Sequence, residues 1–146
     1  MKRHVNIFLA VVSIAFILWG CATSQSVEAS KRSRIYNADY ATVLKAAVDY
    51  CNNNGYAILT VDKDLGILNT DYKSNSGVMN FLGSVQRLKF NLSIIKLTET
   101  QIKIIAIISW QQKKGSDWQE VPGYIGQSPE SKYNELLDGI ESNIPK

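Results

Sequence analysis

The sequence predicts an α+β domain in which an antiparallel sheet of about four to six strands carries two helices on one face. Two amphipathic segments with helical spacing lie near the two ends of the folded part. Between them lie short segments in which apolar and polar residues alternate, several of them connected by turns. Each helix has one apolar side, so both bury most apolar surface by packing on the same face of the sheet.

The folded part is expected to begin with a short strand around Arg34 to Tyr36 and to continue as a helix. Asn37 or Asp39 can cap this helix, which runs to about Asn53. Its apolar residues recur at helical spacing along one side: Tyr40, Val43, Leu44, Ala47, Val48 and Cys51. Gly55, after three asparagines, suits the left-handed conformation that ends a helix.

Two strands are expected to follow as a hairpin, Tyr56 to Val61 and Ile67 to Tyr72. Gly66 in the turn supplies the positive backbone angle. Asp62 and Asp64 resemble part of a calcium loop, but the third oxygen ligand, the later glycine and the distal glutamate are not in register. We therefore expect no metal site and no cofactor.

The clearest pair of strands runs from Arg87 to Leu97 and from Thr100 to Trp110. In the first strand, Leu88, Phe90, Leu92 and Ile94 alternate with polar residues, which predicts one apolar and one polar face. In the second, Ile102, Ile104, Ala106, Ile108 and Trp110 point to one side and Ile105 and Ile107 to the other. The second strand is therefore expected to be central or covered on both sides.

A small basic patch is expected on the polar face, where Arg87, Lys89 and Lys103 can lie together. Solubilising charge is the preferred interpretation, because no aromatic platform for bases is interleaved with these residues. The whole chain carries a net charge of only +3, and Lys2 and Arg3 leave with the expected signal peptide. We therefore expect no nucleic-acid partner.

Two loops are candidate contact surfaces. The loop from Lys73 to Ser84 carries four large apolar residues, Val78, Met79, Phe81 and Leu82. It could contact a partner, a lipid surface or a bound apolar ligand, or it could fold back and plug one end of the core. The segment from Gln111 to Gln127 is expected as a second long loop, with Trp118 and Tyr124 as contact residues and a short edge strand around Trp118 to Val121 as an alternative.

The last helix is well marked. Ser128 can cap it, Pro129 suits its first position, and Glu130 complements its dipole. One apolar stripe follows, and Pro145 stops the helix: Tyr133, Leu136, Leu137, Ile140 and Ile144.

The chain begins with the three-part pattern of a secretory signal peptide, residues 1–20. A basic stretch precedes the apolar run from Val5 to Leu18, and Cys21 follows at the end. This order resembles a bacterial lipoprotein signal, which implies that Cys21 becomes the acylated N-terminus. Trp19 departs from that pattern, and cleavage after Ala22 or an uncleaved anchor remain alternatives, although the run is shorter than the ~20 residues of a spanning helix.

Without the signal peptide, the chain has no histidine, because His4 is the only one. This excludes Ser-His and Cys-His catalysis. Cys51 would be the single remaining thiol, on the apolar side of the first helix, where a buried and inert side chain is the preferred interpretation. We expect a non-enzymatic protein.

Residues 21–33 are polar and small and are expected to form a lipidated flexible tether, followed by one domain over residues 34–146. No aspartate follows Cys21. By resemblance to Gram-negative lipoproteins, this implies the outer membrane, with the domain facing the periplasm.

Three stretches carry a further resemblance: Tyr36-Asn37-Ala38-Asp39-Tyr40, Gly55-Tyr56, and the run from Asp62 to Thr70. They resemble the repeated domain of the C-type accessory lipoprotein of the outer-membrane β-barrel assembly machinery, and of small envelope lipoproteins with that domain. The resemblance covers about Ile35 to Ile144 and implies a helix-grip fold without catalytic residues. That accessory protein has two such domains and a long partner-binding segment, whereas this chain has one domain, so a role in barrel assembly is not carried over.

The sequence thus favours a lipid-anchored periplasmic interaction or structural module of the cell envelope, with an envelope protein as partner. The alternative is a carrier that binds an apolar ligand between the helices and the sheet. Large core residues such as Phe90 and Leu137 argue for a filled core instead.

Overall fold

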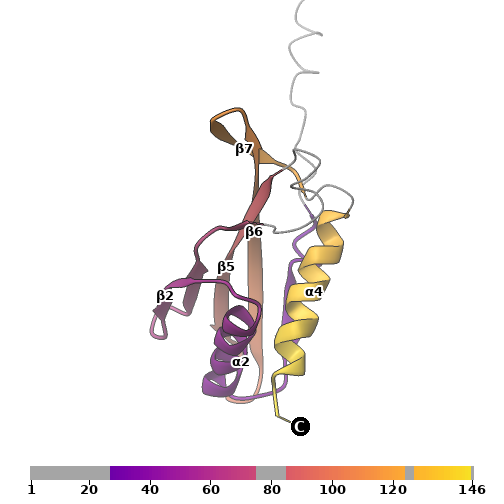
Figure 1. The fold of residues 1–146 in the computed structure, drawn as a ribbon. Helices are drawn as coiled ribbons and strands as arrows, with labels where there is room; N and C mark the ends of the chain where they lie inside the picture. Colours follow the sequence, from indigo (N-terminus) through magenta and orange to yellow (C-terminus); the bar gives the residue numbers. More distant parts are fainter. Residues whose placement is uncertain (1–26, 75–84, 124–126, 146) are drawn as a thin grey trace, which may run out of the picture.

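A computed structural model describes residues 27–74, 85–123 and 127–145 (Figure 1). This part of the chain contains two helices and a seven-stranded sheet. In chain order the elements are β1 (Ser33–Tyr36), α2 (Tyr40–Asn53), β2 (Ile58–Asp62), β3 (Ile67–Thr70), β4 (Lys73–Ser74), β5 (Gln86–Lys96), β6 (Ile102–Lys114), β7 (Asp117–Val121) and α4 (Pro129–Ser142). The predicted α+β class is confirmed.

The sheet has the order β1-β6-β5-β3-β2, and every neighbouring pair is antiparallel. β4 pairs with β5, and β7 pairs with β6. The sheet therefore has more strands than the four to six predicted. β6 continues to Lys114 and returns through Gly115, which has φ +65°, as β7. The alternative of an edge strand around Trp118 to Val121 is confirmed, and a loop over this whole segment is wrong.

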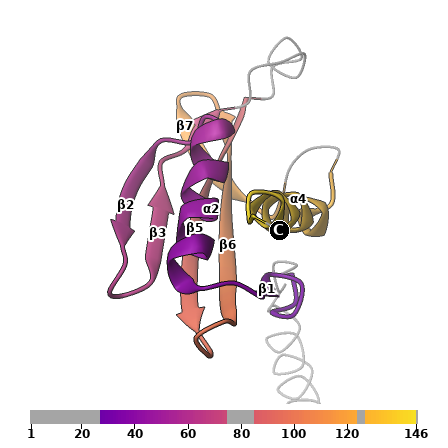
Figure 2. The ribbon, with the colours of Figure 1, turned by 90° about the horizontal axis from the view of Figure 1, so that it is seen from below.

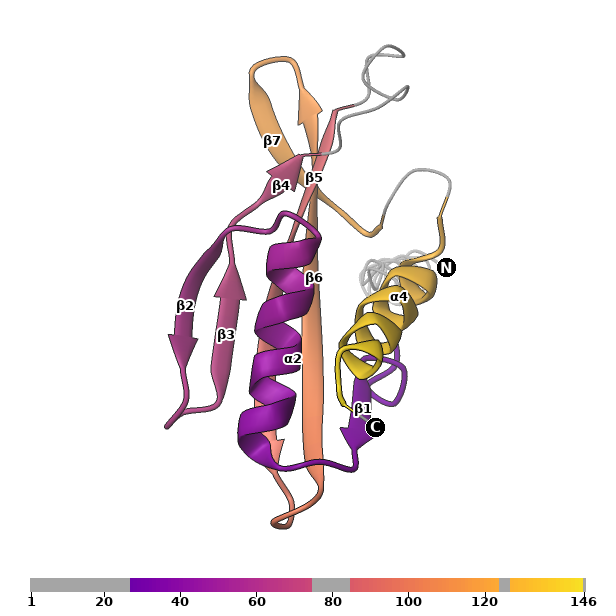
Figure 3. The same cartoon turned by 60° about the horizontal axis from the view of Figure 1, so that its bottom comes forward.

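Both helices cover the same face of the sheet, as Figure 3 shows. Seen from below in Figure 2, β2 and β3 lie on one side of α2, whereas α4 and β1 lie on the other. The layer between helices and sheet is filled by side chains that are at most 2% exposed, among them Val43, Leu68, Phe90, Leu92, Ile102, Ile104, Leu136, Leu137 and Ile140. Its aromatic pairs include Tyr56 and Phe90, whose ring centroids are 4.3 Å apart.

The helix caps agree with the sequence. Asp39 accepts a hydrogen bond from the Thr42 amide at 3.0 Å, and Ser128 accepts one from the Ser131 amide at 3.2 Å. These bonds satisfy amides that the first turn of a helix leaves without an intrahelical partner. The hydrogen bonds from Thr42, led by that of its side chain, also hold the pKa of Asp39 below its usual value.

The buried side of α2 differs from the predicted stripe. Ala46 and Tyr50 are buried, whereas Leu44 and Val48 are only partly buried. The reason is α4, which packs beside α2 with Gly139 against Tyr50. α2 is thus buried on two sides, the side that faces α4 and the side that faces the sheet.

The predicted hairpin is present as β2 and β3. Gly66 has φ +67°, and its carbonyl accepts a hydrogen bond from the Ile94 amide at 2.7 Å. The side chain of Asp62 accepts hydrogen bonds from the amides of Asp64 and Leu65 at 3.0 and 2.9 Å. An acidic residue at this position therefore shapes the turn.

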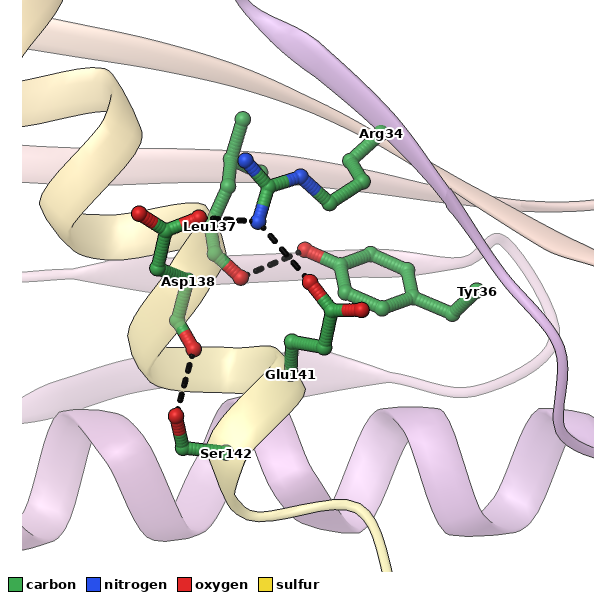
Figure 4. A network of polar contacts seen from close by, with 6 residues as sticks. All are labelled: Arg34, Tyr36, Leu137, Asp138, Glu141 and Ser142. Atoms are coloured by element: carbon green, nitrogen blue, oxygen red, sulfur yellow. Dashed lines mark hydrogen bonds and ion pairs between the residues drawn. The ribbon is translucent and has the colours of Figure 1, made fainter.

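A polar network fixes β1 to α4 (Figure 4). The buried Tyr36 hydroxyl donates to the Leu137 carbonyl at 3.0 Å. Arg34 pairs with Asp138 and, at 3.0 Å, with Glu141. Because β1 is a four-residue edge strand, these contacts with α4 add to the short ladder that β1 forms with β6.

Residues 27–33, which were expected to belong to a flexible tether, contact the domain. Val27 packs against the core, and Lys31 pairs with Glu130 at 2.9 Å. The Arg32 carbonyl accepts a hydrogen bond from the Ala106 amide at 2.8 Å, and Ser33 is the first residue of β1. Ordered structure therefore begins before Arg34, because a turn over residues 29–32 leads into β1 and Arg32 already bonds to β6.

Candidate interaction surface

Most of the residues that the sequence singles out for function lie outside the described residues. This holds for the expected lipidation site and for five of the expected contact residues: Cys21, Val78, Met79, Phe81, Leu82 and Tyr124. Trp118 is described. It lies in β7, where its ring is half-buried against the Arg87 side chain of β5.

The face of the sheet opposite the helices is the most distinctive surface of the described residues. We call it the open face. The strand register identifies its residues, because side chains of directly paired residues point to the same side of a sheet. On β5 and β6 they alternate with the buried core residues and include Arg87, Lys89, Asn91, Ser93 and Ile95, paired with Gln111, Ser109, Ile107, Ile105 and Lys103.

Isoleucines occupy the centre and one end of the open face. Ile107 is 50% exposed on central strand β6, Ile95 is 41% exposed on β5, and Ile35 is 52% exposed on β1. Ile35 and Ile95 both pair with Lys103 from opposite sides, and Ile105 is half-buried between Ser33 and Ser93. The prediction that β6 is a central strand is confirmed, but its second row of isoleucines is not covered by another layer in the described structure.

A cluster of cations and aromatic rings occupies the other end of the open face. The Arg87 guanidinium carbon lies 4.0 Å from the ring centroid of Trp118 and 4.4 Å from that of Tyr72. The Lys89 ammonium lies 4.9 Å from the Tyr72 centroid. Such contacts hold cations through the negative faces of the rings. The sequence-based view that this face lacks aromatic residues is therefore wrong, because Tyr72 and Trp118 arrive from segments outside the main strand pair.

Hydrogen bonds fix the cluster in place. Arg87 donates through Nε to the side-chain oxygen of Gln111 at 2.9 Å, and Gln111 donates to Glu120 at 2.8 Å. Glu120 also accepts from the Tyr72 hydroxyl at 3.3 Å. Burial and the nearby Glu120 charge raise the pKa of Tyr72, so the phenol stays protonated and remains a donor.

The cations of the open face differ from those of the helical side. Arg87, Lys89, Lys103 and Lys113 have no carboxylate of the described residues within ion-pair distance. On the helical side, by contrast, cations pair with acids of α2 and α4, as Lys45 does with Asp49, Lys132 with Glu135 and Arg34 with Asp138. The register places two carboxylates on the open face, Glu120 and Asp62, and both are already hydrogen-bonded. Four cations against two carboxylates leave the described part of this face with a net positive charge.

Cys51 lies in the core and is 0% exposed. Burial raises the pKa of its thiol to about 12. A nucleophilic cysteine needs a lowered pKa and access to solvent, and this thiol has neither. The interpretation of Cys51 as a packing residue fits this position.

A scan against protein-family models finds no match to the chain, and a search of curated proteins finds no significant relative. Among the described residues, neither helix is long and apolar enough to cross a membrane. The same residues contain no group of three or more acidic, histidine or cysteine side chains that could hold a metal ion.

Proposed function

We propose that the protein is a non-enzymatic interaction module of the cell envelope, anchored by lipid on Cys21 and facing the periplasm from the outer membrane. The domain contacts its partner through the open face. The anchor follows from the lipoprotein-like signal, and the resemblance to the assembly-machinery accessory lipoprotein suggests an envelope protein as one class of partner.

The observation that carries this proposal is the composition of the open face. Exposed isoleucines such as Ile107 lie beside cations without carboxylate partners, and a Tyr72–Arg87–Trp118 stack borders them. Exposed apolar side chains gathered on one face are typical of interaction sites. Aromatic residues and arginine are also enriched at protein interfaces.

The carrier alternative has less support. A carrier needs space between the helices and the sheet for an apolar ligand. In this layer Phe90 and Leu136 are 0% exposed and Leu137 is 1% exposed, so large side chains fill the position that a ligand would take. Native mass spectrometry of the purified protein would detect a bound apolar molecule if the carrier were correct.

The anchor is tested by the intact mass of the protein purified from bacterial membranes, beside a Cys21→Ala variant. The proposal expects a mature chain that begins at an acylated Cys21 and a variant that leaves the membrane fraction or retains its signal. An unmodified chain beginning at Thr23 would contradict the anchor.

The contact surface is tested by photo-crosslinking in living cells, with p-benzoylphenylalanine in place of Ile107. The matched control carries the same group in place of Asn134, which is exposed on α4. The proposal expects crosslinked products from position 107 and few from position 134. Equal yields of protein crosslinks from both positions would contradict contact of a protein partner with the open face.

A further inference from the structure

We propose that the open face docks onto an anionic lipid surface, so that the sheet of the anchored domain lies against the membrane. This inference rests on the proposed anchor at Cys21 for its setting. The docking itself is a property of the described residues of the face, and it is tested separately below.

The charged and the apolar side chains of the open face both match a lipid surface. Arg87, Lys89, Lys103 and Lys113 have no carboxylate partner among the described residues, so they are available to lipid phosphates. Cations near an anionic leaflet are attracted individually and additively. The exposed isoleucines lie among them and can enter the boundary between headgroups and acyl chains.

The aromatic residues fit the same interpretation. Tyr72 and Trp118 lie at one end of the face, each with a ring against the Arg87 guanidinium. Aromatic rings with one polar and one apolar part are enriched at the level of lipid headgroups. An arginine held between two rings keeps its charge while it approaches an apolar surface, because the rings replace part of its hydration.

The short distance between the anchor and the domain also favours lipid as the occupant of the open face. Val27 is the first described residue and packs on the domain, so only six residue steps separate it from Cys21. A fully extended segment of this length spans about 20 Å. The chain then enters β1, whose Ser33 and Ile35 lie on the open face. An acylated Cys21 therefore holds the domain, and with it this face, at a high effective concentration near the lipid.

Charge argues against a second copy of the chain as the occupant. Two open faces in contact would bring Arg87, Lys89, Lys103 and Lys113 of both copies together, and like charges in an interface are unfavourable. A protein partner with acidic groups remains a distinct outcome of the experiment.

The native tryptophans provide the probe. Without the signal peptide, the chain has only Trp110 and Trp118. Trp110 is 5% exposed in the core, whereas Trp118 lies on the open face. The purified protein is reconstituted into vesicles of phosphatidylethanolamine with brominated phosphatidylcholine, with or without phosphatidylglycerol as a minor component. Bromine quenches only tryptophan in close contact with the acyl chains.

We expect quenching in the vesicles that contain phosphatidylglycerol and much less in the vesicles without it. A Trp118→Phe variant should lose the quenching, because its remaining Trp110 is enclosed by the core. Absence of quenching in both vesicle types, or equal quenching of the parent and of Trp118→Phe, would overturn the proposal.

A charge-matched pair of variants tests the cations in the Cys21→Ala background, purified in the form without residues 1–20, so that neither an acyl chain nor the signal masks weak binding. Lys89→Gln with Lys103→Gln should lower partitioning onto the phosphatidylglycerol vesicles about thirtyfold relative to their Cys21→Ala parent. Lys45→Gln with Lys132→Gln removes the same charge from the helical side and should change partitioning little. Equal effects of the two pairs would overturn a specific role of the open face.

These results separate the two proposals. Crosslinks from position 107 to a protein, together with unquenched Trp118 in vesicles, would overturn lipid docking and leave the interaction module in place. An unacylated Cys21 together with phosphatidylglycerol-dependent quenching would contradict the anchor and support the lipid-binding face.

Discussion

Gly139 of α4 lies directly against the ring of Tyr50 of α2, so closely that a methyl group on Gly139 would overlap the Cε2 and Cδ2 atoms of the ring. The two helices touch at this point, and the ring of Tyr50 is almost fully buried there. The glycine thus allows the side-by-side arrangement of the helices that covers the sheet.

A Gly139→Ala variant should lower the free energy of unfolding by about 1–3 kcal/mol through overpacking. Helix propensity alone would act the other way, because alanine is favoured over glycine by about 1 kcal/mol inside a helix. Urea unfolding checks the sign. Asn134→Ala, at an exposed position of α4, is the control and should be close to neutral. A stabilised Gly139→Ala variant would mean that the helices are not in contact at this point.

Gly66 and Gly115 form a matched pair for the β-turns. Both have positive φ, +67° and +65°, but a Cβ on Gly66 would overlap the Ile94 carbonyl oxygen, whereas nothing lies within 4 Å of one on Gly115. Gly115→Ala should therefore cost about 1 kcal/mol of unfolding free energy from backbone conformation alone. Gly66→Ala should cost clearly more in the same urea titration. Equal losses for the two variants would contradict the close approach of the turn to β5.

The hydroxyl of Tyr36 should contribute to stability more than that of Tyr40. Tyr36 donates to the Leu137 carbonyl in a buried position, and Tyr40 donates to the Lys63 carbonyl at an exposed one. Removal of the buried hydroxyl in Tyr36→Phe loses this hydrogen bond and should cost about 1 kcal/mol of unfolding free energy. Tyr40→Phe should cost less, because water replaces the lost bond. Thermal unfolding of both variants compares them, and the opposite ranking would contradict the network of β1 and α4.

The thiol of Cys51 should make stability depend on alkaline pH. Its pKa is raised from 9.0 to about 12 by burial. A thiol whose pKa is higher in the folded state than in the unfolded state stabilises the folded state. This contribution is fully present below the pKa of the unfolded state and is lost as pH rises through the pKa of the folded state. The unfolding free energy should therefore fall between about pH 9 and pH 12, by up to about 1.4 kcal/mol per pH unit from this group. A Cys51→Ala variant should show a shallower fall over the same range in denaturant titrations, and parallel curves would contradict the buried thiol.

The sequence is sufficient for elements whose signals are local. The cap, first residue and dipole partner of α4 are the adjacent residues Ser128, Pro129 and Glu130, and the helix begins there. The alternation along β5 likewise predicts which residues are buried, because side chains of a strand point to alternate faces. Each of these predictions depends on neighbouring residues only.

The sequence is insufficient where contacts join distant segments. Arg34 and Asp138 are 104 positions apart, and nothing near either residue indicates the pairing. The stack of Tyr72, Arg87 and Trp118 likewise requires the register of β7 on β6, which a loop-like composition with glycines conceals. The position of these aromatic residues on the open face therefore becomes apparent only in the folded structure.

Residue-level carbene footprinting measures contact through the open face in the native envelope. The protein is labelled once in isolated envelopes and once after purification in detergent, and mass spectrometry compares each residue. We expect Ile95 and Ile107 to lose labelling in the envelopes, whereas Lys45 and Asn134, on the exposed side of the helices, should keep theirs. Protection of the helices with unchanged labelling of the two isoleucines would contradict contact through the open face.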